Sequence, residues 1–460
     1  MSSEWIETVY GAMPFGLNCA KLGELCVEGG VQTGPFGSQL HQEDYVESGT
    51  PIITVEHLGK NRIVHANLPK VSDEDRQRLA KYTLKCGDIV FSRVGSVDRR
   101  ALVQQREDGW LFSGRCLRVR PQTEILDSQW LSYFFGLPSF KNYIRGIAVG
   151  ATMPSLNTKL LSDVPIYFPC LDIQRQAAIA LSALDDRITL LRETNATLEA
   201  IAQAIFKSWF VDFDPVRAKQ EGRAPEGMDE TTAALFPDSF EESELGLVPR
   251  GWGVEWLSNV FDFKEGQGIR NWQYTNSDVG TRFINIRCIK DGDLSIETAN
   301  RITDEEANGK YAHFHLKSWD VVVSTSGTLG RSAIVREDHL PLMLNTSVIR
   351  FRPVEGMTCF SYVYEYLNTP EFMFKVESMA SGSVQKNFGP MHLKQMKLVL
   401  PPIELIVCYE SAARPLFEKI VTNRARAQTL AALRDTLLPR LISGQLRLPD
   451  AEDIIAETAT

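Results

Sequence analysis

The chain has 460 residues, of which 43% are hydrophobic, and a formal net charge of −9. This composition is typical of a soluble protein with packed cores. No stretch approaches the roughly 18–20 apolar residues of a membrane span, and the N-terminus lacks the basic and apolar pattern of a signal peptide. The eight cysteines are scattered without a CxxC pair. We therefore expect a cytoplasmic protein with reduced thiols rather than disulfides or zinc ligands.

The negative charge is concentrated in one segment. Residues 211–250 contain ten acidic and four basic residues, whereas residues 1–170 contain 18 of each, and residues 251–400 contain 17 acidic and 16 basic residues. DNA responds to the local charge of a surface rather than to the sum over a chain. The net charge therefore leaves the partner open and does not exclude nucleic acid.

The first part of the chain predicts a mixed domain of helices and strands. Two helices are expected, at Ser72–Lys81 and at Ser128–Arg145, the second with Leu131, Phe134 and Phe135 on one face. Apolar, β-branched runs predict strands separated by turns with Gly and Asp. These runs lie at 51–55, 88–92, 116–120 and 164–169.

A heptad pattern follows Pro169. Its residues recur at alternating spacings of four and three, which predicts one helix of a coiled coil over about four heptads. The predicted seam is Ala177, Leu181, Leu184, Ile188, Leu191, Asn195, Leu198, Ala202 and Ile205. Pro215 is expected to end this helix. The acidic, proline-containing segment Asp214–Trp252 then predicts an ordered but irregular connection rather than a third domain.

The next part of the chain repeats the first at an offset of 232 residues. GDIVFSRVGSVDRRALV (Gly87–Val103) aligns without a gap with WDVVVSTSGTLGRSAIV (Trp319–Val335), and ten of the 34 positions from Asp88 to Pro121 are identical. Average residue usage predicts roughly two identities. The runs RFINI, DVVVS, SVIRFR and MKLVLP copy the strands of the first part. A period this long indicates a duplicated domain with its following helix, not a solenoid.

The second heptad pattern lies at the same place in the repeat as the first. Its seam is Tyr409, Ala413, Leu416, Ile420, Asn423, Ala427, Leu430, Arg434 and Leu437. We expect the two helices to pair as a coiled coil, and the alternative is two unrelated surface helices. Pro415 is expected to kink the second helix or to begin its continuous part, and Pro439 to stop or bend it.

Motifs of catalysis are absent from the sequence. It contains no GxxxxGK[ST] loop, no HExxH, no GxSxG and no Gly-rich dinucleotide fingerprint. The nearest approach to an amino-methyltransferase tetrapeptide, Asp214-Pro215-Val216, lacks the second proline and the aromatic residue. His313 and His315 are better read as an exposed pair on a strand than as metal ligands. These absences together favour a binding or organising protein.

Two pairs of loops carry residues suited to DNA contact. Backbone amides, hydroxyls and arginines after each central strand suit phosphate and base-edge contacts, and the loops near 32–39 and 264–271 carry Gln, Asn and Arg side chains that read bases. An ordinary hairpin with glycine at a positive φ is the alternative for any one loop. The candidate DNA-binding residues are Gln32, Ser38, Arg62, Arg93, Ser96, Arg99, Arg100, Thr152, Gln267, Arg270, Asn271, Ser326, Thr328, Arg331, Lys386 and Asn387.

Over nearly its whole length the chain resembles the specificity (S) subunits of type I restriction–modification systems. The resemblance is carried by the two GDIV-type and WDVV-type segments with their glycine loops, the junctions PIYFPCLDIQRQ and LVLPPIELIVCYE, the segments AIFKSWFVDFDPV and FPDSFEESELGLVPRGW, and the terminal LRDTLLPRLISGQLRL. The usual Leu/Ile-x-Glu-Gln junction departs from the family pattern: it stands here as Asp172-Ile173-Gln174-Arg175-Gln176, and the second copy has lost it. The start of the second helix is therefore open.

The resemblance implies an α+β fold with two homologous target recognition domains, separated by two long helices that form an antiparallel coiled coil. An approximate two-fold axis and closure by the termini are implied as well. We expect recognition domains at 1–170 and 253–402, helical regions at 171–212 and 403–445, an acidic linker at 213–252 and a tail at 446–460. The tail is expected to pack near the start of the chain, with Ile442 and Leu446 buried near Trp5 and Phe15. Under an antiparallel two-fold, Asn195 and Asn423 are expected to meet.

The resemblance also implies a function without catalysis in this chain. Each recognition domain reads one half of a bipartite DNA site, which is expected to be non-palindromic because the two repeats differ in their loops. Two modification (methyltransferase) subunits and the restriction (translocase/nuclease) subunits are the implied partners. S-adenosylmethionine, ATP and Mg²⁺ are implied for these partners and no cofactor for this chain. The alternatives are an unrecognised DNA methyltransferase or nuclease, and a duplicated protein-interaction scaffold without a DNA role.

Overall fold

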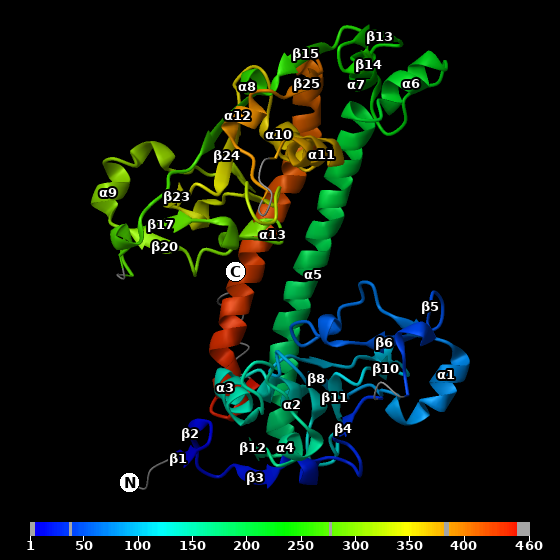
Figure 1. Ribbon diagram of the computed structural model, residues 1–460, viewed down its shortest axis with the longest axis vertical. Coiled ribbons are helices and arrows are strands. Elements are labelled where there is room, and N and C mark those ends of the chain that lie inside the picture. The colour runs from blue at the N-terminus through cyan, green and yellow to red at the C-terminus, as the bar shows by residue number, and fades with distance from the viewer. Residues whose placement is uncertain (1–4, 36–38, 276–277, 381–385, 449–460) are drawn as a thin grey trace. The chain divides into compact units, whose positions relative to one another are not determined.

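The structure is a computed structural model that describes residues 5–35, 39–275, 278–380 and 386–448 (Figure 1). The chain divides into two compact units. Unit 1 comprises Met1–Thr189 with Gln428–Thr460, and unit 2 comprises Leu190–Ala427. Each unit therefore contains one repeat and a segment of each of the two long helices, α5 (Leu171–Phe210) and α13 (Ile403–Ile442).

Unit 1 contains two four-stranded sheets, with strand orders β10-β6-β7-β5 and β4-β11-β8-β9. All pairs in these sheets are antiparallel except β10 with β6. The strands of the unit are β1 (Trp5–Thr8), β2 (Gly11–Pro14), β3 (Asn18–Lys21), β4 (Gln32–Thr33), β5 (Tyr45–Val46), β6 (Thr50–Ile53), β7 (Lys70–Val71), β8 (Ile89–Ser92), β9 (Arg100–Leu102), β10 (Leu111–Phe112), β11 (Cys116–Val119) and β12 (Pro165–Phe168). Its shorter helices are α1 (Asp73–Arg78), α2 (Ser128–Phe134), α3 (Pro138–Ile147) and α4 (Thr158–Ser162).

Unit 2 has a central sheet of order β16-β24-β21-β22 and a second sheet of order β20-β17-β23. Its strands are β13 (Phe240–Ser243), β14 (Gly246–Pro249), β15 (Gly253–Trp256), β16 (Phe261–Glu265), β17 (Thr281–Ile284), β18 (Ile289–Lys290), β19 (Asp293–Leu294), β20 (Asn300–Ile302), β21 (Val321–Ser324), β22 (Ser332–Ile334), β23 (Leu342–Leu344), β24 (Val348–Pro353) and β25 (Lys397–Leu400). Its shorter helices are α6 (Asp214–Gln220), α7 (Glu230–Ala234), α8 (Leu257–Val260), α9 (Asp304–Asn308), α10 (Phe360–Leu367), α11 (Pro370–Met379) and α12 (Pro390–Leu393).

The central sheets of the two units have the same topology and register. Val90 pairs with Arg118 in unit 1, and Val322 pairs with Arg350 in unit 2, so both members of the pair shift by 232 residues. The strands β8 and β21 are buried along their whole length. The predicted α+β fold with two homologous units is therefore confirmed.

An ion pair inside each sheet also recurs at the same offset. Asp88 is 1% exposed, and both of its oxygens accept hydrogen bonds from Arg120 at 2.6 Å. Asp320 is 2% exposed and accepts from Arg352 in the same way. Two parallel N–H···O bonds give such a pair a fixed geometry, so it holds two strands together. The identical residues of the repeat are thus partly structural.

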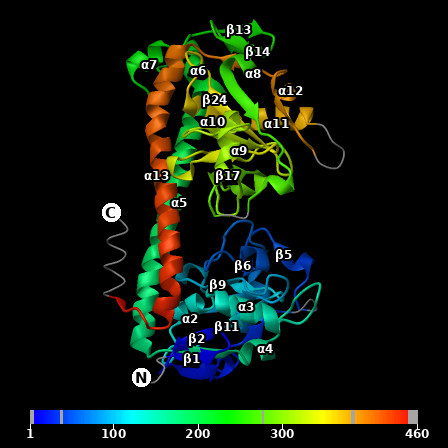
Figure 2. The same ribbon diagram turned by 90° about the vertical axis from the view of Figure 1, so that its left-hand side faces the viewer.

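The long helices α5 and α13 lie side by side in both views (Figures 1 and 2). In unit 2 the Tyr409 hydroxyl donates to the Ala202 carbonyl oxygen at 3.2 Å, and the Asn423 amide donates to the Asn195 Oδ1 atom at 2.9 Å. Residue numbers rise along one helix as they fall along the other, so the pair is antiparallel. The predicted meeting of Asn195 and Asn423 is confirmed, and the alternative of unrelated surface helices is wrong.

Pro215 does not end α5, and neither Pro415 nor Pro439 ends α13. Helix α5 ends at Phe210, before Pro215, which instead lies in the first turn of α6 where its missing N–H is not needed. Helix α13 runs from Ile403 through both Pro415 and Pro439 to Ile442. Phe417, not the predicted Leu416, takes the fully buried position after Pro415. Packing of one face thus offsets the roughly 3 kcal/mol that an interior proline costs.

The acidic segment between α5 and the second repeat folds onto the end of α5. It forms α6, α7 and the hairpin β13–β14. Val216, Phe236 and Trp252 are buried in the same hydrophobic cluster as Trp209 and Phe210. Six acidic residues of the α7 and hairpin region, between Asp229 and Glu244, are exposed, while these apolar side chains anchor the segment. The segment is therefore ordered by aromatic packing.

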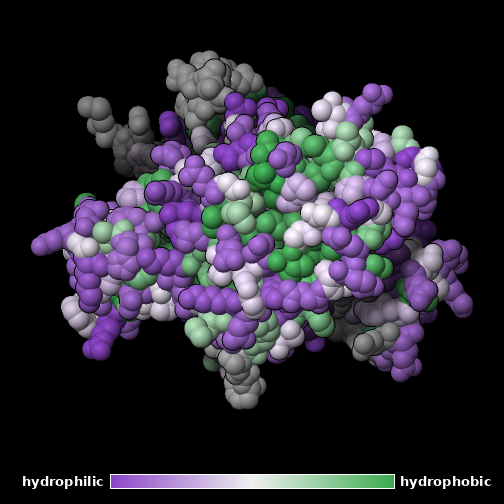
Figure 3. Space-filling model, turned by 90° about the horizontal axis from the view of Figure 1, so that it is seen from above, coloured by the Kyte–Doolittle hydropathy of each residue, from purple (hydrophilic) through white to green (hydrophobic). Residues whose placement is uncertain are grey.

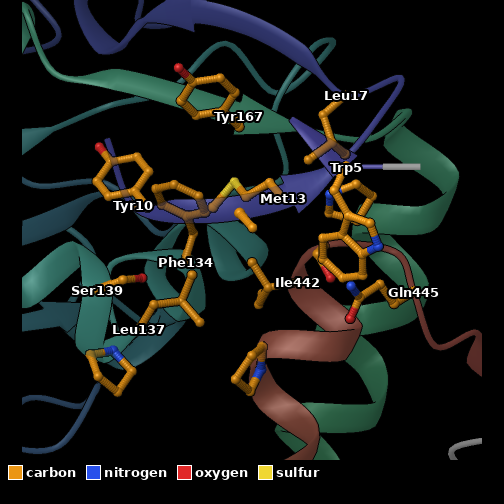
Figure 4. Close-up of a pocket in the computed structure, with 15 residues that line it drawn as sticks. Trp5, Tyr10, Met13, Leu17, Phe134, Leu137, Ser139, Tyr167, Ile442 and Gln445 are labelled. Carbon is orange, nitrogen blue, oxygen red and sulfur yellow. The ribbon is translucent and has the colours of Figure 1, made fainter. Parts of the chain in front are cut away.

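The end of α13 packs against the start of the chain within unit 1. Ile442 is 2% exposed and Leu446 is 6% exposed, as predicted. Trp5 and Ile442 line one pocket of about 300 Å³, and Figure 4 shows both among its lining side chains. The expectation for Phe15 was wrong, because this side chain is 76% exposed. It lies in the two-residue turn that follows β2 directly.

Candidate nucleic-acid interface

In unit 1, the loop that follows the central strand β8 is held by backbone hydrogen bonds. The Ser92 hydroxyl donates to the Val94 carbonyl oxygen at 3.0 Å, and Gly95 adopts a φ of 80°, which glycine tolerates best. The Gly95 amide donates to the Pro154 carbonyl oxygen at 2.8 Å, and the Leu156 amide donates to the Arg93 carbonyl oxygen at 2.9 Å. The 93–96 loop is therefore joined to the 149–156 loop through main-chain atoms.

Unit 2 builds the same junction with different side chains. The Ser324 hydroxyl donates to the Thr328 carbonyl oxygen at 2.7 Å, and the Phe388 amide donates to the Thr325 carbonyl oxygen at 3.2 Å. Ser326 forms a bridge with Asn387, and Val94 forms the equivalent bridge with Ser155 in unit 1. Both bridges obey the offset of 232 residues. The loop pair is thus a repeated structural feature.

A third loop leaves each sheet at the same edge. Strands β4 and β8 both run antiparallel to β11 and both end at its N-terminal end, where Thr33 pairs with Leu117 and Ser92 with Cys116. In unit 2, Glu265 of β16 and Ser324 of β21 end beside Ile349 and Val348 of β24. The loops after β4 and β16 therefore lie at the edge from which the other two loops project.

One glycine in each of these third loops permits close packing. A Cβ atom on Gly34 would overlap the Ser113 carbonyl oxygen, and a Cβ atom on Gly266 would overlap the Asn345 carbonyl oxygen. The Gly34 amide donates to the Cys116 carbonyl oxygen, and the Gly266 amide donates to that of Val348, both at 3.2 Å. Because backbone approaches backbone there, only glycine fits without a shift. These glycines position the loops at the sheet edge.

The structure brings most of the predicted residues to this edge. Ser96 and Thr152 are exposed on the two joined loops of unit 1, and Gln32 is half-buried where β4 enters the third loop. In unit 2, Gln267, Arg270 and Asn271 are exposed on the third loop, while Ser326, Thr328, Lys386 and Asn387 line the joined loops. Ser38 lies outside the described residues.

Several predicted arginines direct their guanidinium groups elsewhere. Arg62 pairs with Asp186 on α5, and Arg99 donates to the Leu58 carbonyl oxygen. Arg100 is 8% exposed and donates to the Ser132 carbonyl oxygen at 2.9 Å, so it is not displayed at the loop edge as expected. Arg93 donates to the Gly114 carbonyl oxygen at 3.0 Å, which ties it to the neighbouring strand connection. Arg331 is exposed at the start of β22.

Some exposed residues at or after these loops were missed from the sequence. Arg115 is exposed immediately before β11, and its carbonyl oxygen accepts the Arg93 amide at 2.8 Å. Met153 is 65% exposed between Thr152 and Pro154, and Trp272 is 75% exposed after Asn271. Met153 and Trp272 had a signal in the sequence, since each adjoins a predicted loop residue, whereas Arg115 had none. Met153 and Trp272 are mainly apolar, and the predicted residues are hydrogen-bonding ones.

Unit 2 also exposes apolar side chains away from these loops. Seen from above, hydrophobic residues gather among hydrophilic ones on the face in Figure 3. In the hairpin region, Leu245 is 42% exposed and Leu247 is 62% exposed. On α13, Val407 is 54% exposed. Apolar side chains exposed in this way are typical of surfaces that bind other proteins.

The described residues contain no group of three or more His, Cys, Asp or Glu side chains that could hold a metal ion. Within the same part of the chain, no helix has both the length and the apolar character needed to cross a membrane.

Comparisons with known proteins agree on one family. A sequence model described as "Type I restriction modification DNA specificity domain" matches residues 20–200. The type I restriction enzyme HindI specificity subunit of Haemophilus influenzae is 26% identical over 430 residues, 84% of this chain and 92% of that protein. The MjaIX specificity subunit of Methanocaldococcus jannaschii is 24% identical over 324 residues, 70% of each chain.

The fold has a counterpart among solved structures. The crystal structure of a type I restriction–modification system S subunit from M. genitalium covers 93% of this chain and 96% of its own, with a TM-score of 0.54 at 14% identity. At this identity the likeness concerns the fold. The sequence model and the two relatives show that the chain is similar to the specificity subunits of type I restriction enzymes.

Proposed function

We propose that the chain is a DNA sequence-specificity subunit that reads a bipartite, non-palindromic site, one half with each unit. The observation that carries the proposal is the repeated loop edge. Each unit presents three loops at one end of the same sheet, and two of these loops are joined by equivalent main-chain contacts. Such loops on a rigid sheet suit contact with base edges and phosphates.

The side chains on the two loop edges differ, which supports two different half-sites. Val94 and Ser155 form the bridge in unit 1, whereas Ser326 and Asn387 form it in unit 2. An asparagine side chain can pair with adenine through two hydrogen bonds, which a serine cannot do. Two units that read different half-sites would give a site without palindromic symmetry.

The proposal assigns the chemistry to partner subunits. The named relatives are subunits of type I restriction enzymes. We infer that two modification subunits and the restriction subunits bind this chain, that they supply S-adenosylmethionine, ATP and Mg²⁺, and that the chain acts in the cytoplasm on double-stranded DNA. The exposed Leu245, Leu247 and Val407 side chains offer apolar surface for such docking.

The test is half-site selectivity. The target is first identified by mapping methylated adenines in cells that contain the complete system. Ser96→Ala with Thr152→Ala should then weaken reading of one half-site, and Lys386→Ala with Asn387→Ala should weaken reading of the other, by about 1–3 kcal/mol per lost base contact. Lys419→Ala, on the exposed face of α13, is the matched control and should change neither. If either double variant affects both half-sites alike, independent reading by the two units is wrong.

Two further measurements address the alternatives. The purified chain, incubated with DNA and either S-adenosylmethionine or Mg²⁺, should neither methylate nor cleave it, and turnover would establish an enzyme instead. Binding of target DNA should weaken as salt is raised. A chain that binds the partner subunits but no DNA would support a protein-interaction scaffold.

A further inference from the structure

A second polar site lies in unit 1, beside the connection from β8 to β9. It is a pocket of about 450 Å³ between the 58–61 segment, the start of β9, helices α2 and α3, and the unit 1 segments of α5 and α13. Its charged lining consists of Lys60, Arg99, Arg100, Lys141 and Arg434 on the basic side, and of Asp98, Asp185 and Asp435 on the acidic side. The lining therefore carries a net charge of +2, from five cations and three carboxylates.

The three carboxylates of the pocket are already paired. Asp98 binds Arg145, which lies outside the pocket lining, at 2.6 Å. Asp185 binds Arg434 at 2.6 Å and accepts from the Tyr133 hydroxyl at 2.7 Å. Asp435 binds Arg434 at 2.7 Å. One arginine of the lining thus occupies two of its three carboxylates.

The remaining four cations have no carboxylate partner among the ion pairs of the described residues. Arg99 donates to the Leu58 carbonyl oxygen, and Arg100 donates through Nε to the Ser132 carbonyl oxygen. Lys60 is exposed, and Lys141 is half-buried on α3. Four positive groups therefore line one cavity. The only hydrogen-bond acceptors given above for these groups are two backbone carbonyl oxygens, those of Leu58 and Ser132.

Arg100 is the most informative of these groups, because it is 8% exposed. Burial lowers the pKa of its guanidinium to about 10. The pKa of Lys141 is lowered too, by burial and then by the charge of Arg100. A buried cation without a paired anion is costly, so a site that keeps buried Arg100 beside half-buried Lys141 is suited to an anionic ligand.

The surrounding sequence makes room for this arginine. A Cβ atom on Gly136 would lie 2.5 Å from the Arg100 Nη2 atom. Unit 2 has Ser332 and Asn368 at the equivalent positions, and the Ser332 hydroxyl donates to the Asn368 Oδ1 atom at 2.7 Å. An arginine beside a glycine in one repeat is thus replaced by a compact hydrogen-bonded pair in the other.

The two lysines of the pocket are also specific to unit 1. At the positions equivalent to Lys60 and Lys141, unit 2 has Gly292 and Met373. Only Arg99 has a basic equivalent, Arg331. The shared fold can therefore form without these charges, and a structural explanation for them is insufficient.

We propose that this pocket in unit 1 binds a phosphate group. Arginine forks match phosphate oxygens through two hydrogen bonds, and a lining of net +2 matches a phosphate dianion. The phosphate can come from the DNA backbone, in which case the inference rests on the proposed function, or from a free phosphate-bearing molecule, in which case it is independent of that function.

The experiment compares the full chain with Lys60→Ala/Lys141→Ala, and uses Lys85→Ala as the matched control. Lys85 is an exposed lysine that precedes β8, at the end of the strand away from the loop edge. Both pocket lysines are partly exposed, so the double variant should fold, which circular dichroism checks. Inorganic pyrophosphate is titrated calorimetrically, and target DNA is titrated over a range of salt concentrations.

A free ligand as the source predicts saturable pyrophosphate binding that the double variant weakens about tenfold or more. Backbone phosphate as the source predicts little pyrophosphate binding, weaker DNA binding by the double variant, and a smaller slope of log affinity against log salt, by about one for each lost contact. Lys85→Ala should behave as the unaltered chain in both arms.

The proposal is overturned if the double variant matches the unaltered chain in both titrations. The same DNA titration, run with target and non-target sequences, separates the two proposals. If the unaltered chain prefers target DNA and the pocket substitutions change no titration, only the phosphate pocket is refuted. If the unaltered chain binds target and non-target DNA equally, the proposed function is refuted.

Discussion

The buried amide pair of the long helices offers a sharp test of their register. Asn195 is 7% exposed and Asn423 is 1% exposed. The Asn423 amide donates to Asn195 Oδ1 at 2.9 Å, and the Asn195 amide donates to the Ile420 carbonyl oxygen at 3.2 Å. The Asn423 Oδ1 atom is buried and has no hydrogen-bond partner among the described residues. The pair is therefore only partly satisfied.

Replacing one member should be costly, and replacing both should not. Asn423→Leu leaves Asn195 Oδ1 without its donor, and Asn195→Leu leaves Asn423 with no side-chain partner, so each single change should destabilise by about 1–3 kcal/mol. The double change to leucine removes every unpaired group and adds apolar burial worth about 1.5–3 kcal/mol per fully buried leucine. The double variant should therefore exceed the unaltered chain in stability.

The assay is a double-mutant cycle from equilibrium urea unfolding. We expect a coupling free energy of at least about 1 kcal/mol, because the two residues share one hydrogen-bond network. Gln203→Leu, an exposed position on α5, is the control and should leave the unfolding midpoint nearly unchanged. Additive single effects, or a double variant less stable than both singles, would refute the reasoning. Since a buried Asn pair specifies register, the double variant should also blur the preference for one spacer length between half-sites.

Three further predictions concern stability. Asp88→Ala should lower the free energy of unfolding by about 3–5 kcal/mol in urea titration, because it leaves a half-buried guanidinium unpaired. Gly34→Ala should cost about 1–3 kcal/mol through forced backbone movement, whereas Gly146→Ala, with open space around its Cβ position on α3, should gain up to about 1 kcal/mol. Burial, and then the charge of Glu199, raises the pKa of Glu365 to about 8. Between about pH 4.5 and 8 the folded chain therefore keeps a proton on Glu365 that the unfolded chain has lost. The free energy of unfolding should fall as the pH rises through this range, and Glu365→Gln should reduce that fall.

Each of the three stability predictions has an outcome that would contradict it. An Asp88→Ala variant with an unchanged midpoint would mean that the ion pair does not hold the strands. Equal effects of the two glycine substitutions would remove the close-packing argument. A pH profile of Glu365→Gln that runs parallel to that of the unaltered chain would show that this carboxyl does not cause the slope. Thermal or urea unfolding at several pH values supplies all three comparisons.

Much of the framework was predictable from local pattern and from the repeat. The run 88–92 became β8 (Ile89–Ser92), and both heptad patterns became helices that begin two residues after a proline, at Leu171 and Ile403. The expected helix at 128–145 is two helices, α2 and α3, because the chain turns at Gly136 before Pro138 begins the second. Strands of only two residues, such as β4 and β5, are too short to show an alternating pattern in the sequence.

The position of the loop edge was predictable from the sequence, but the partners of its arginine side chains were not. The repeat marks the 93–96 and 325–328 segments, and the structure joins each of them to a second loop. The guanidinium group lies at the end of a long side chain, so its hydrogen-bond partner depends on tertiary neighbours. The spacing of residues in the sequence does not reveal these neighbours. Arg100 illustrates this, since its partner Ser132 lies 32 residues further along the chain and the space it fills depends on Gly136.

The repeated contacts explain how one framework can carry two different reading surfaces. The bridges Val94–Ser155 and Ser326–Asn387 hold their loops through main-chain atoms, so the side chains at these positions can change while the loop keeps its place. The contacts that do require particular residues, such as Gly34 against Ser113 and the Asp88–Arg120 pair, lie inside or behind the sheet edge. Because scaffold and reading surface depend on different atoms, substitutions in the loops can alter the DNA sequence that is read without disturbing the fold. Exchange of the bridging residues between the units should therefore be tolerated structurally. The test is the double variant Val94→Ser/Ser155→Asn, which gives unit 1 the bridging residues of unit 2, measured by circular dichroism and urea unfolding. A large loss of stability would mean that the side chains do hold the loops.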